Sequence, residues 1–284
     1  MGRMGKRRGF RTERVEHHMM RKIFPMRIIK VLLLAVCLTM ASAAPAQNWG
    51  KVITGLWKTH QAMTITDERL AQMVSEEVAY MDQQNKVLGY NNSYSKRLRR
   101  VMSGINSVEG ISLNFKVYKT SELNAFACPD GSVRVFSGLM DQLSDDELLG
   151  VLGHEIGHVA LKHSKKAWRS AMMRSAASDA IGVFSDTWAT ISDSFLGSVS
   201  SAVLSAAHSK VHETEADDYG YDLLKRHDKN PWAMVKLFEK LKKMSKSKNL
   251  KYTKWLKVFA SHPDYDTRIN HLKSRCEEDG FTRP

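Results

Sequence analysis

The spacing of apolar residues changes from helical to strand-like along the chain, and this predicts helices followed by a small β-sheet. Between residues 66 and 84, apolar side chains recur every three or four positions, which predicts a helix. A second helix is expected over residues 94–103. Residues 111–118 alternate apolar and polar side chains, as a half-buried strand does. Residues 129–131, Pro-Asp-Gly, are a turn signal, and residues 132–136 predict a second strand.

A further long helix is predicted immediately after this sheet, over residues 144–162. Ser144 followed by Glu147 forms a capping box, so the sequence marks where the helix begins. Small residues form a stripe along this largely apolar helix: Gly150, Gly153, Gly157 and Ala160. Because each interior glycine costs about 1 kcal/mol relative to alanine, the stripe indicates that another backbone packs closely against the helix.

Residues 167–207 are rich in alanine and serine, and we expect one or two loosely packed helices there. Such helices could cover a cleft or form an ordinary structural hairpin, and the sequence leaves both interpretations open. Asp179, Asp186 and Asp193 recur through the segment, which argues against a membrane span.

Residues 1–46 read as a leader rather than as part of the folded protein. From Met26 the chain carries basic residues, then an apolar run and then small residues, as secretory signal peptides do. We expect the true start at Met20 or Met26 and cleavage near Ala46. The remaining residues, 47–284, are long enough for a single compact domain with its own core.

The leader carries most of the excess positive charge. It holds +8 of the formal net charge of +13, which leaves +5 on the mature chain. The composition therefore does not support nucleic-acid binding. Lysines cluster over residues 236–257, and we interpret them as a solvated helical face, with contact to acidic lipid headgroups as the weaker alternative.

The cysteines bear on anchoring and on redox compartment. Cys37 lies in the apolar run and follows Val36, where a lipidation site needs a small residue, so we expect no lipid anchor. The mature chain keeps Cys128 and Cys276. These two could pair in an oxidising compartment, but the sequence does not show that they meet.

The predicted helix over residues 144–162 contains the sequence His-Glu-Ile-Gly-His at residues 154–158. Because residues four apart lie on one helical face, His154 and His158 can reach the same metal ion. Two neutral imidazoles suit Zn²⁺, and Glu155 between them could accept the proton of a water that attacks a carbonyl. The pattern is a metalloprotease signature. A surface helix with two solvated histidines is the alternative, and the apolar surroundings argue against it.

A catalytic zinc site needs a third protein ligand, and the sequence His-Glu-Thr-Glu-Ala-Asp at residues 212–217 offers several. Glu213 and Asp217 share a helical face, so Glu213 could bind the metal while Asp217 accepts the N–H of a ligand histidine. Spacing ranks Glu213 only narrowly ahead of three other candidates: His208, His212 and Glu215.

Together, the two motifs resemble those of the HtpX-like and BepA-like gluzincin peptidases, in which H-E-x-x-H is followed by E-x-x-A-D. The resemblance runs from about residue 66 to residue 272 and is most specific for the periplasmic LoiP-type members. It implies that Glu213 is the third zinc ligand and that Asp217 supports a ligand histidine. The implied fold is α+β, a predominantly helical zincin fold with a small β-sheet packed beside the metal-binding helix.

Two further passages resemble the same family. One resembles its substrate-binding edge strand, whose free backbone groups can pair with an extended peptide: Asn124, Ala125, Phe126 and Ala127. The other is Ser-His-Pro at residues 261–263, followed by Arg268. The resemblance implies that His262 lies near the metal, where it stabilises an oxyanion or occupies the open zinc position at rest. Arg268 would hold this segment by a charged contact.

These features predict a secreted, periplasmic zinc metalloendopeptidase with one Zn²⁺ per chain. His154, His158 and Glu213 would bind zinc, and Glu155 would be the general base. The resemblance implies unfolded or misfolded envelope proteins as substrates, in protein quality control. One alternative is a chaperone-like binder of such proteins with a closed zinc site. Another is a zinc hydrolase of a different amide, against which the edge strand argues.

Overall fold

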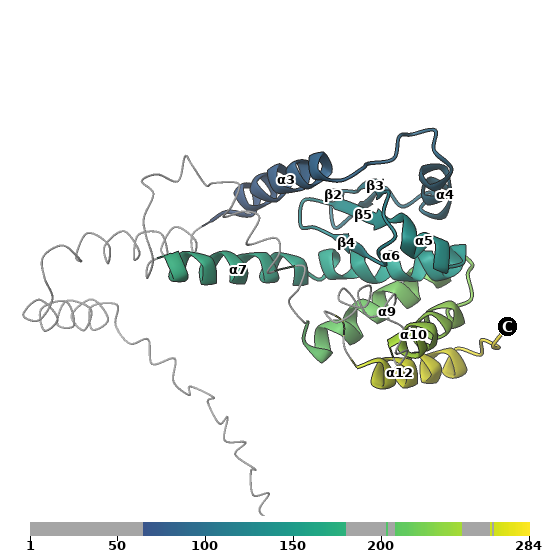
Figure 1. The fold of residues 1–284 in the computed structure, drawn as a ribbon. Helices are drawn as coiled ribbons and strands as arrows, with labels where there is room; N and C mark the ends of the chain where they lie inside the picture. The colour runs from purple at the N-terminus through teal and green to yellow at the C-terminus, as the bar shows by residue number, and fades with distance from the viewer. Residues whose placement is uncertain (1–64, 180–202, 204–207, 246–261, 263) are drawn as a thin grey trace, which may run out of the picture. The chain divides into compact units, whose positions relative to one another are not determined.

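The computed structural model describes residues 65–179, 203, 208–245, 262 and 264–284, all within a compact unit of residues 51–284 (Figure 1). The leader, most of the segment 180–207 and the lysines beyond residue 245 lie outside the described residues. The described elements, in chain order, are α3 (Asp67–Gln84), α4 (Ser93–Val101), β1 (Ser107–Val108), β2 (Ile111–Ser112), β3 (Asn114–Tyr118), β4 (Ala125–Ala127), β5 (Ser132–Phe136), α5 (Ser137–Gln142), α6 (Asp145–Ala160), α7 (His163–Asp179), α9 (Lys210–Arg226), α10 (Trp232–Ser245) and α12 (Tyr265–Glu278). This mostly helical α+β architecture confirms the predicted fold class.

The first two helices begin and end close to where the sequence predicts. The side chain of Thr66 caps α3 by accepting a hydrogen bond from the Arg69 backbone N–H. The apolar face of α3 is buried, as its spacing predicts. α4 ends at Val101, two residues before the predicted end at Ser103.

The strand predicted over residues 111–118 is wrong as a single element. It is divided at Leu113 into β2, which pairs antiparallel with β1, and β3, which pairs parallel with β5. Glu109 and Gly110 both have positive φ angles, of 48° and 78°. Two such residues make the tight turn of a β-hairpin, so the chain folds β2 back onto β1 before β3 begins.

The three-stranded sheet has the order β3-β5-β4, with β4 antiparallel to β5. β4 is therefore an edge strand in the part of the chain that the structure describes. It packs against α6, so its free edge lies beside the long helix (Figure 1).

A short helix separates the sheet from the long helix, which we predicted to follow at once. α5 spans six residues, too few to show a helical period in the sequence. Gly138 lets α5 pack against the preceding loop, because a Cβ there would lie 2.5 Å from the carbonyl oxygens of Ser121 and Glu122.

The long helix α6 begins at the predicted capping box. Ser144 Oγ accepts from the Glu147 backbone N–H, and the Glu147 carboxylate accepts from the Ser144 N–H. The helix ends at Ala160, two residues before the predicted end, and Lys162 turns the chain with φ of 62°. This turn starts α7 at His163.

Gly153 and Gly157 in the glycine stripe of α6 pack against α9, which supplies the close backbone approach that the stripe predicts. A Cβ at Gly153 would lie 2.9 Å from the Cα of Gly220, and one at Gly157 would lie 3.2 Å from the Ala216 carbonyl oxygen. The two backbones therefore approach more closely than side chains would permit. This close packing sets how far the side chains of α6 lie from those of α9.

A largely buried ion pair connects α3 to the sheet. Arg134 on β5 has a side chain that is only 2% exposed, and its guanidinium donates to Asp82 near the end of α3, over 2.7 and 3.0 Å. Lys116 and the Tyr118 hydroxyl also donate to this carboxylate. Burial raises the pKa of Asp82, but these donors outweigh it and hold the pKa below its ordinary value.

Cys128 and Cys276 form no disulfide bond. Cys128 belongs to a small apolar cluster between α3, the sheet and α7, while Cys276 belongs to the larger core around α6. Both side chains are buried in packed clusters, so each behaves as a small apolar residue here. No helix among the described residues is long and apolar enough to cross a membrane.

Candidate metal centre and active site

α6 brings the two predicted ligand histidines together. His154 and His158 are one turn apart on a helix that is apolar around them, and both side chains are buried. Their Nε2 atoms point to the same place and lie 3.1 Å apart. Burial lowers the pKa of His158 well below its ordinary value, so this ring stays neutral and keeps a lone pair.

α9 supplies the carboxylate. Ser209 caps the start of α9, which places Glu213 in its first turn and aims the side chain at α6. The Glu213 oxygens lie 3.4 Å from His158 Nε2 and 3.7 Å from His154 Nε2. Burial raises the pKa of Glu213, but the imidazoles of His158 and His262 against its oxygens and the other positive charge nearby outweigh it, so the pKa is far below normal.

These donors fit a divalent metal ion. Nitrogen ligands at about 2.0–2.1 Å in a tetrahedral site lie about 3.3 Å from each other, and the observed donor separations of 3.1, 3.4 and 3.7 Å bracket this value. Two imidazole lone pairs facing each other would repel unless a cation lay between them. His154, His158 and Glu213, with His262, form a group whose ligand atoms all lie within 4.8 Å of one another.

A buried ion pair holds His154. Its Nδ1–H donates to Asp217 Oδ1 over 2.8 Å, which leaves the lone pair on Nε2. Arg268 donates to the same carboxylate through Nε at 2.7 Å and through its terminal nitrogen at 2.5 Å. Burial raises the pKa of Asp217, but Arg268 outweighs it, so the carboxylate stays ionised.

Arg268 also reaches the other side of the site. Its guanidinium lies 2.8 Å from a Glu213 oxygen and donates to the His262 backbone carbonyl over 3.2 Å. It is itself 3% exposed, so it forms the buried countercharge for both carboxylates. The contact that the sequence predicted between Arg268 and the His262 segment is present in this geometry.

His262 lies within the group of metal ligands. Its Nδ1 is 2.9 and 3.0 Å from the two Glu213 oxygens and 3.3 Å from His154 Nε2. Its Nε2 lies 3.8 Å from the Glu155 carboxylate. Of the two positions that the sequence left open for His262, this geometry corresponds to the fourth metal position rather than to a donor aimed at substrate.

Glu155 faces a small cavity beside this group. Burial raises its pKa, which increases its affinity for a proton. The cavity has a volume of about 40 Å³, which holds a few water molecules and no extended peptide.

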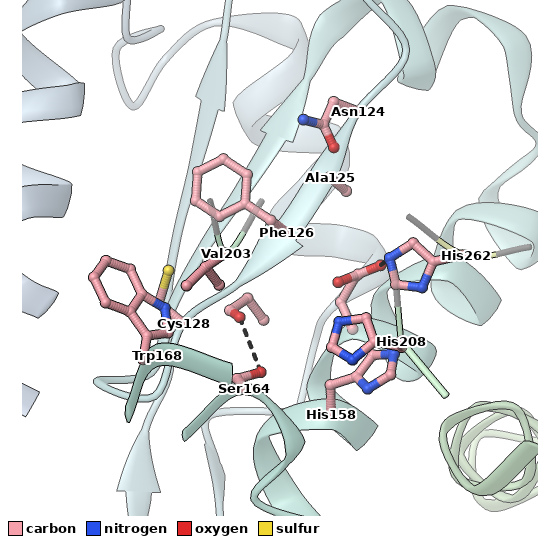
Figure 2. Close-up of a pocket in the computed structure, with 12 residues that line it drawn as sticks. Asn124, Ala125, Phe126, Cys128, His158, Ser164, Trp168, Val203, His208 and His262 are labelled. Atoms are coloured by element: carbon pink, nitrogen blue, oxygen red, sulfur yellow. Dashed lines mark hydrogen bonds and ion pairs between the residues drawn. The ribbon is translucent and has the colours of Figure 1, made fainter. Parts of the chain in front are cut away.

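The predicted edge-strand residues line the same cavity: Asn124, Ala125, Phe126 and Ala127. Figure 2 shows Phe126, Trp168 and Val203 at its apolar end and the imidazoles of His158, His208 and His262 at the other. An edge strand, a general-base candidate and a metal-ligand group therefore share one cavity.

Comparison with known proteins identifies the family. The model of peptidase family M48 matches residues 90–276. The chain is 35% identical over 250 residues to metalloprotease YcaL of Escherichia coli (strain K12), a match that covers 86% of this chain and 96% of that protein. This chain belongs to peptidase family M48.

Two other proteins that are similar to this chain also carry the names of proteases. Metalloprotease LoiP of Escherichia coli (strain K12) is 32% identical over 259 residues, or 89% of this chain and 99% of that protein. The beta-barrel assembly-enhancing protease of Yersinia pestis is 28% identical over 187 residues, or 63% of this chain and 37% of that protein. Membership of M48 makes the chain a metallopeptidase.

Two residues of this M48 site were missed or misjudged from the sequence. His208, weighed only as a rival ligand, stacks on His158 with ring centroids 4.2 Å apart and lines the cavity, and burial lowers its pKa to about 4. No motif in the sequence singles out His163, yet its Nδ1 lies 3.1 Å from His158 Nδ1. His163 follows His158 by five residues, and this short separation is the only sign in the sequence that the two could meet. The turn at Lys162 is what brings the His163 ring against His158.

Proposed function

We propose that this M48 metallopeptidase is a zinc-dependent endopeptidase of the periplasm that degrades unfolded or misfolded envelope proteins. The observation that carries the proposal is the convergence of His154 Nε2, His158 Nε2 and the Glu213 carboxylate beside Glu155. Two imidazoles and one carboxylate are a common donor set of catalytic zinc. Zinc, when bound, would supply a Lewis acid that lowers the pKa of water and polarises the scissile carbonyl.

The protein's own groups divide the remaining work. Glu155, whose pKa burial raises, accepts the proton of the attacking water and passes it to the leaving amine. Asp217 and Arg268 hold His154 and Glu213 in place. β4, an edge strand among the described residues, would offer its free edge to an extended polypeptide, which favours unfolded chains over compact ones.

The cellular role rests on the leader and on the relatives. Residues 1–46 have the order of charged, apolar and small residues of a secretory signal, which supports export and cleavage near Ala46. The relative in Yersinia pestis is named for β-barrel assembly, which supports envelope proteins as substrates. N-terminal sequencing of the protein from the periplasm tests export and cleavage near Ala46. A periplasmic chain that still carries residues 1–46 would contradict the cleavage.

The decisive test compares wild type with Glu155→Gln on unfolded casein, with zinc measured in the same samples. We expect one zinc per chain in both proteins and a loss of cleavage of about 10²–10⁴-fold in the variant, the usual contribution of a general base. Asp146→Asn, at a partly exposed position in the first turn of α6 and away from the cavity, is the matched control and should cleave normally. Cleavage by Glu155→Gln at the wild-type rate would refute the mechanism.

One observation favours the second candidate, a binder of unfolded envelope proteins with a closed zinc site. His262 lies against Glu213 and His154, where it would fill the fourth coordination position of the metal. The cavity beside it is too small for an extended peptide. Such a binder would retain zinc, bind unfolded protein and cleave it in neither wild type nor Glu155→Gln. His262→Ala would then restore access, and new cleavage by this variant would return the protein to the peptidase interpretation.

A further inference from the structure

Behind the ligand His158 lies a second imidazole that the proposed mechanism does not use. The turn after α6 starts α7 at His163, and His163 Nδ1 lies 3.1 Å from His158 Nδ1. His163 Nε2, on the far side of the ring, lies 3.1 Å from Glu215 Oε2 on α9. The side chains of His158 and His163 are 2% and 3% exposed, whereas that of Glu215 is 49% exposed.

The positions of the protons along these three residues follow from the metal-binding atom. A neutral imidazole has one N–H and one lone pair. Because His158 directs Nε2 at the metal position, its proton must be on Nδ1, and His163 Nδ1 must accept it. His163 then carries its own proton on Nε2, which faces the Glu215 carboxylate. Each N–H along this path meets an acceptor.

A second metal site at His163, His212 and Glu215 competes with this arrangement, since their ligand atoms lie within 4.8 Å of one another. Two observations argue against it. The rings of His163 and His212 are stacked, with centroids 4.0 Å apart and planes 18° apart. An imidazole lone pair lies in its ring plane, so stacked rings cannot both direct one at the same ion.

The second argument concerns the proton. A metal on His163 Nε2 would force the proton of His163 onto Nδ1, where it would meet the N–H of His158 at 3.1 Å. A second metal therefore conflicts with metal bound by His158 Nε2.

We propose that His163 and Glu215 are positioning residues that fix the orientation and tautomer of the metal ligand His158 through the hydrogen-bond chain His158–His163–Glu215. This inference rests on the proposed zinc site. It gives the two ligand histidines different supports, because His154 donates directly to the buried Asp217, whereas His158 donates to a neutral ring backed by a half-exposed carboxylate. Partners of this kind usually raise metal affinity about 10–100-fold.

The test measures zinc affinity by competition with a chromogenic chelator, and zinc stoichiometry, on the full chain. His163→Phe fills the space but cannot accept a hydrogen bond, and we expect its affinity for zinc to fall about 10–100-fold. His163→Asn places an amide oxygen where Nδ1 lies and should restore affinity to within about threefold of wild type. Glu215→Gln keeps an acceptor oxygen, so its zinc affinity should fall less than that of His163→Phe.

The matched control is His212→Phe, which keeps a ring stacked on His163 and should bind one zinc with unchanged affinity. Two zinc ions in wild type, with one lost in His212→Phe, would establish the second metal site and overturn the proposal. Equal affinity in wild type and His163→Phe would overturn it too, as would equal losses in His163→Phe and His163→Asn, which would show a packing role. A wild-type chain that binds no zinc would refute the proposed function itself, and the hydrogen-bond chain with it.

Discussion

Gly153→Ala tests whether the close packing of α6 on α9 sets the metal site. The added Cβ would lie 2.9 Å from Gly220 Cα and 3.0 Å from Leu223 Cδ2. Carbon atoms normally approach to about 3.5–4.0 Å, so the helices must separate locally by roughly 0.5–1 Å. Since Glu213 is on α9 and the next residue of α6 is His154, this separation moves ligand atoms apart.

The magnitude follows from two opposed effects. Alanine stabilises a helix interior by about 1 kcal/mol relative to glycine, whereas overpacking a core costs about 1–3 kcal/mol. The net destabilisation is then up to about 2 kcal/mol, which lowers Tm by up to about 8 °C in a domain of this size. Metal sites tolerate errors of only about 0.2 Å in ligand distance, so we expect zinc affinity to fall at least about tenfold.

The assay combines thermal unfolding of the metal-free protein with zinc titration. Gly150→Ala is the control, because its Cβ would meet the flexible Met234 side chain, at 2.8 Å, instead of the α9 backbone. We expect this variant to keep zinc affinity within about threefold of wild type, since methionine side chains readily change rotamer. Wild-type zinc affinity in Gly153→Ala, or equal losses in both variants, would refute the reasoning.

Three further predictions concern stability and specificity. Asp82→Asn should lower the free energy of unfolding by about 3 kcal/mol at pH 7, because Arg134 loses its buried countercharge. The pKa of Asp82 is held below its ordinary value of 3.8, so this contribution is present above about pH 4 and lost as the pH falls further. The free energies of unfolding of variant and wild type, measured by urea denaturation, should therefore converge as the pH falls below about 4, and a constant difference would contradict the ion pair. Removing zinc with a chelator, from a sample with free zinc at about 1,000 times Kd, should cost about 4 kcal/mol and lower Tm by about 8–16 °C in calorimetry. An unchanged Tm would show that the metal binds elsewhere or not at all. Trp168→Ala should cost about 3–5 kcal/mol and enlarge the apolar end of the cavity. Mass spectrometry of casein fragments should then show bulkier residues at the cleavage site, and an unchanged pattern would exclude this cavity as a specificity pocket.

Signals within one segment of the sequence are sufficient to predict several elements of this protein. The capping box at Ser144 marks the start of α6, and the four-residue spacing of His154 and His158 places both imidazoles on one face. The glycine stripe also predicted a close backbone partner, because only packing offsets the cost of glycine in a helix. The prediction of strands failed where a short turn interrupts the alternation of apolar and polar residues. The turn at Glu109 and Gly110, between β1 and β2, is such a place.

Which distant groups contact the metal ligands depends on the packing of the helices and cannot be predicted from the sequence. Spacing could not choose firmly between Glu213 and its neighbours, and nothing local showed that His163 returns to His158 or that His262 lies against Glu213. Those contacts depend on how α6, α7 and α9 pack and on where Arg268 anchors the chain. A periodic pattern specifies which face of a helix is buried. The atoms that meet that face are fixed only when the other helices have packed against it.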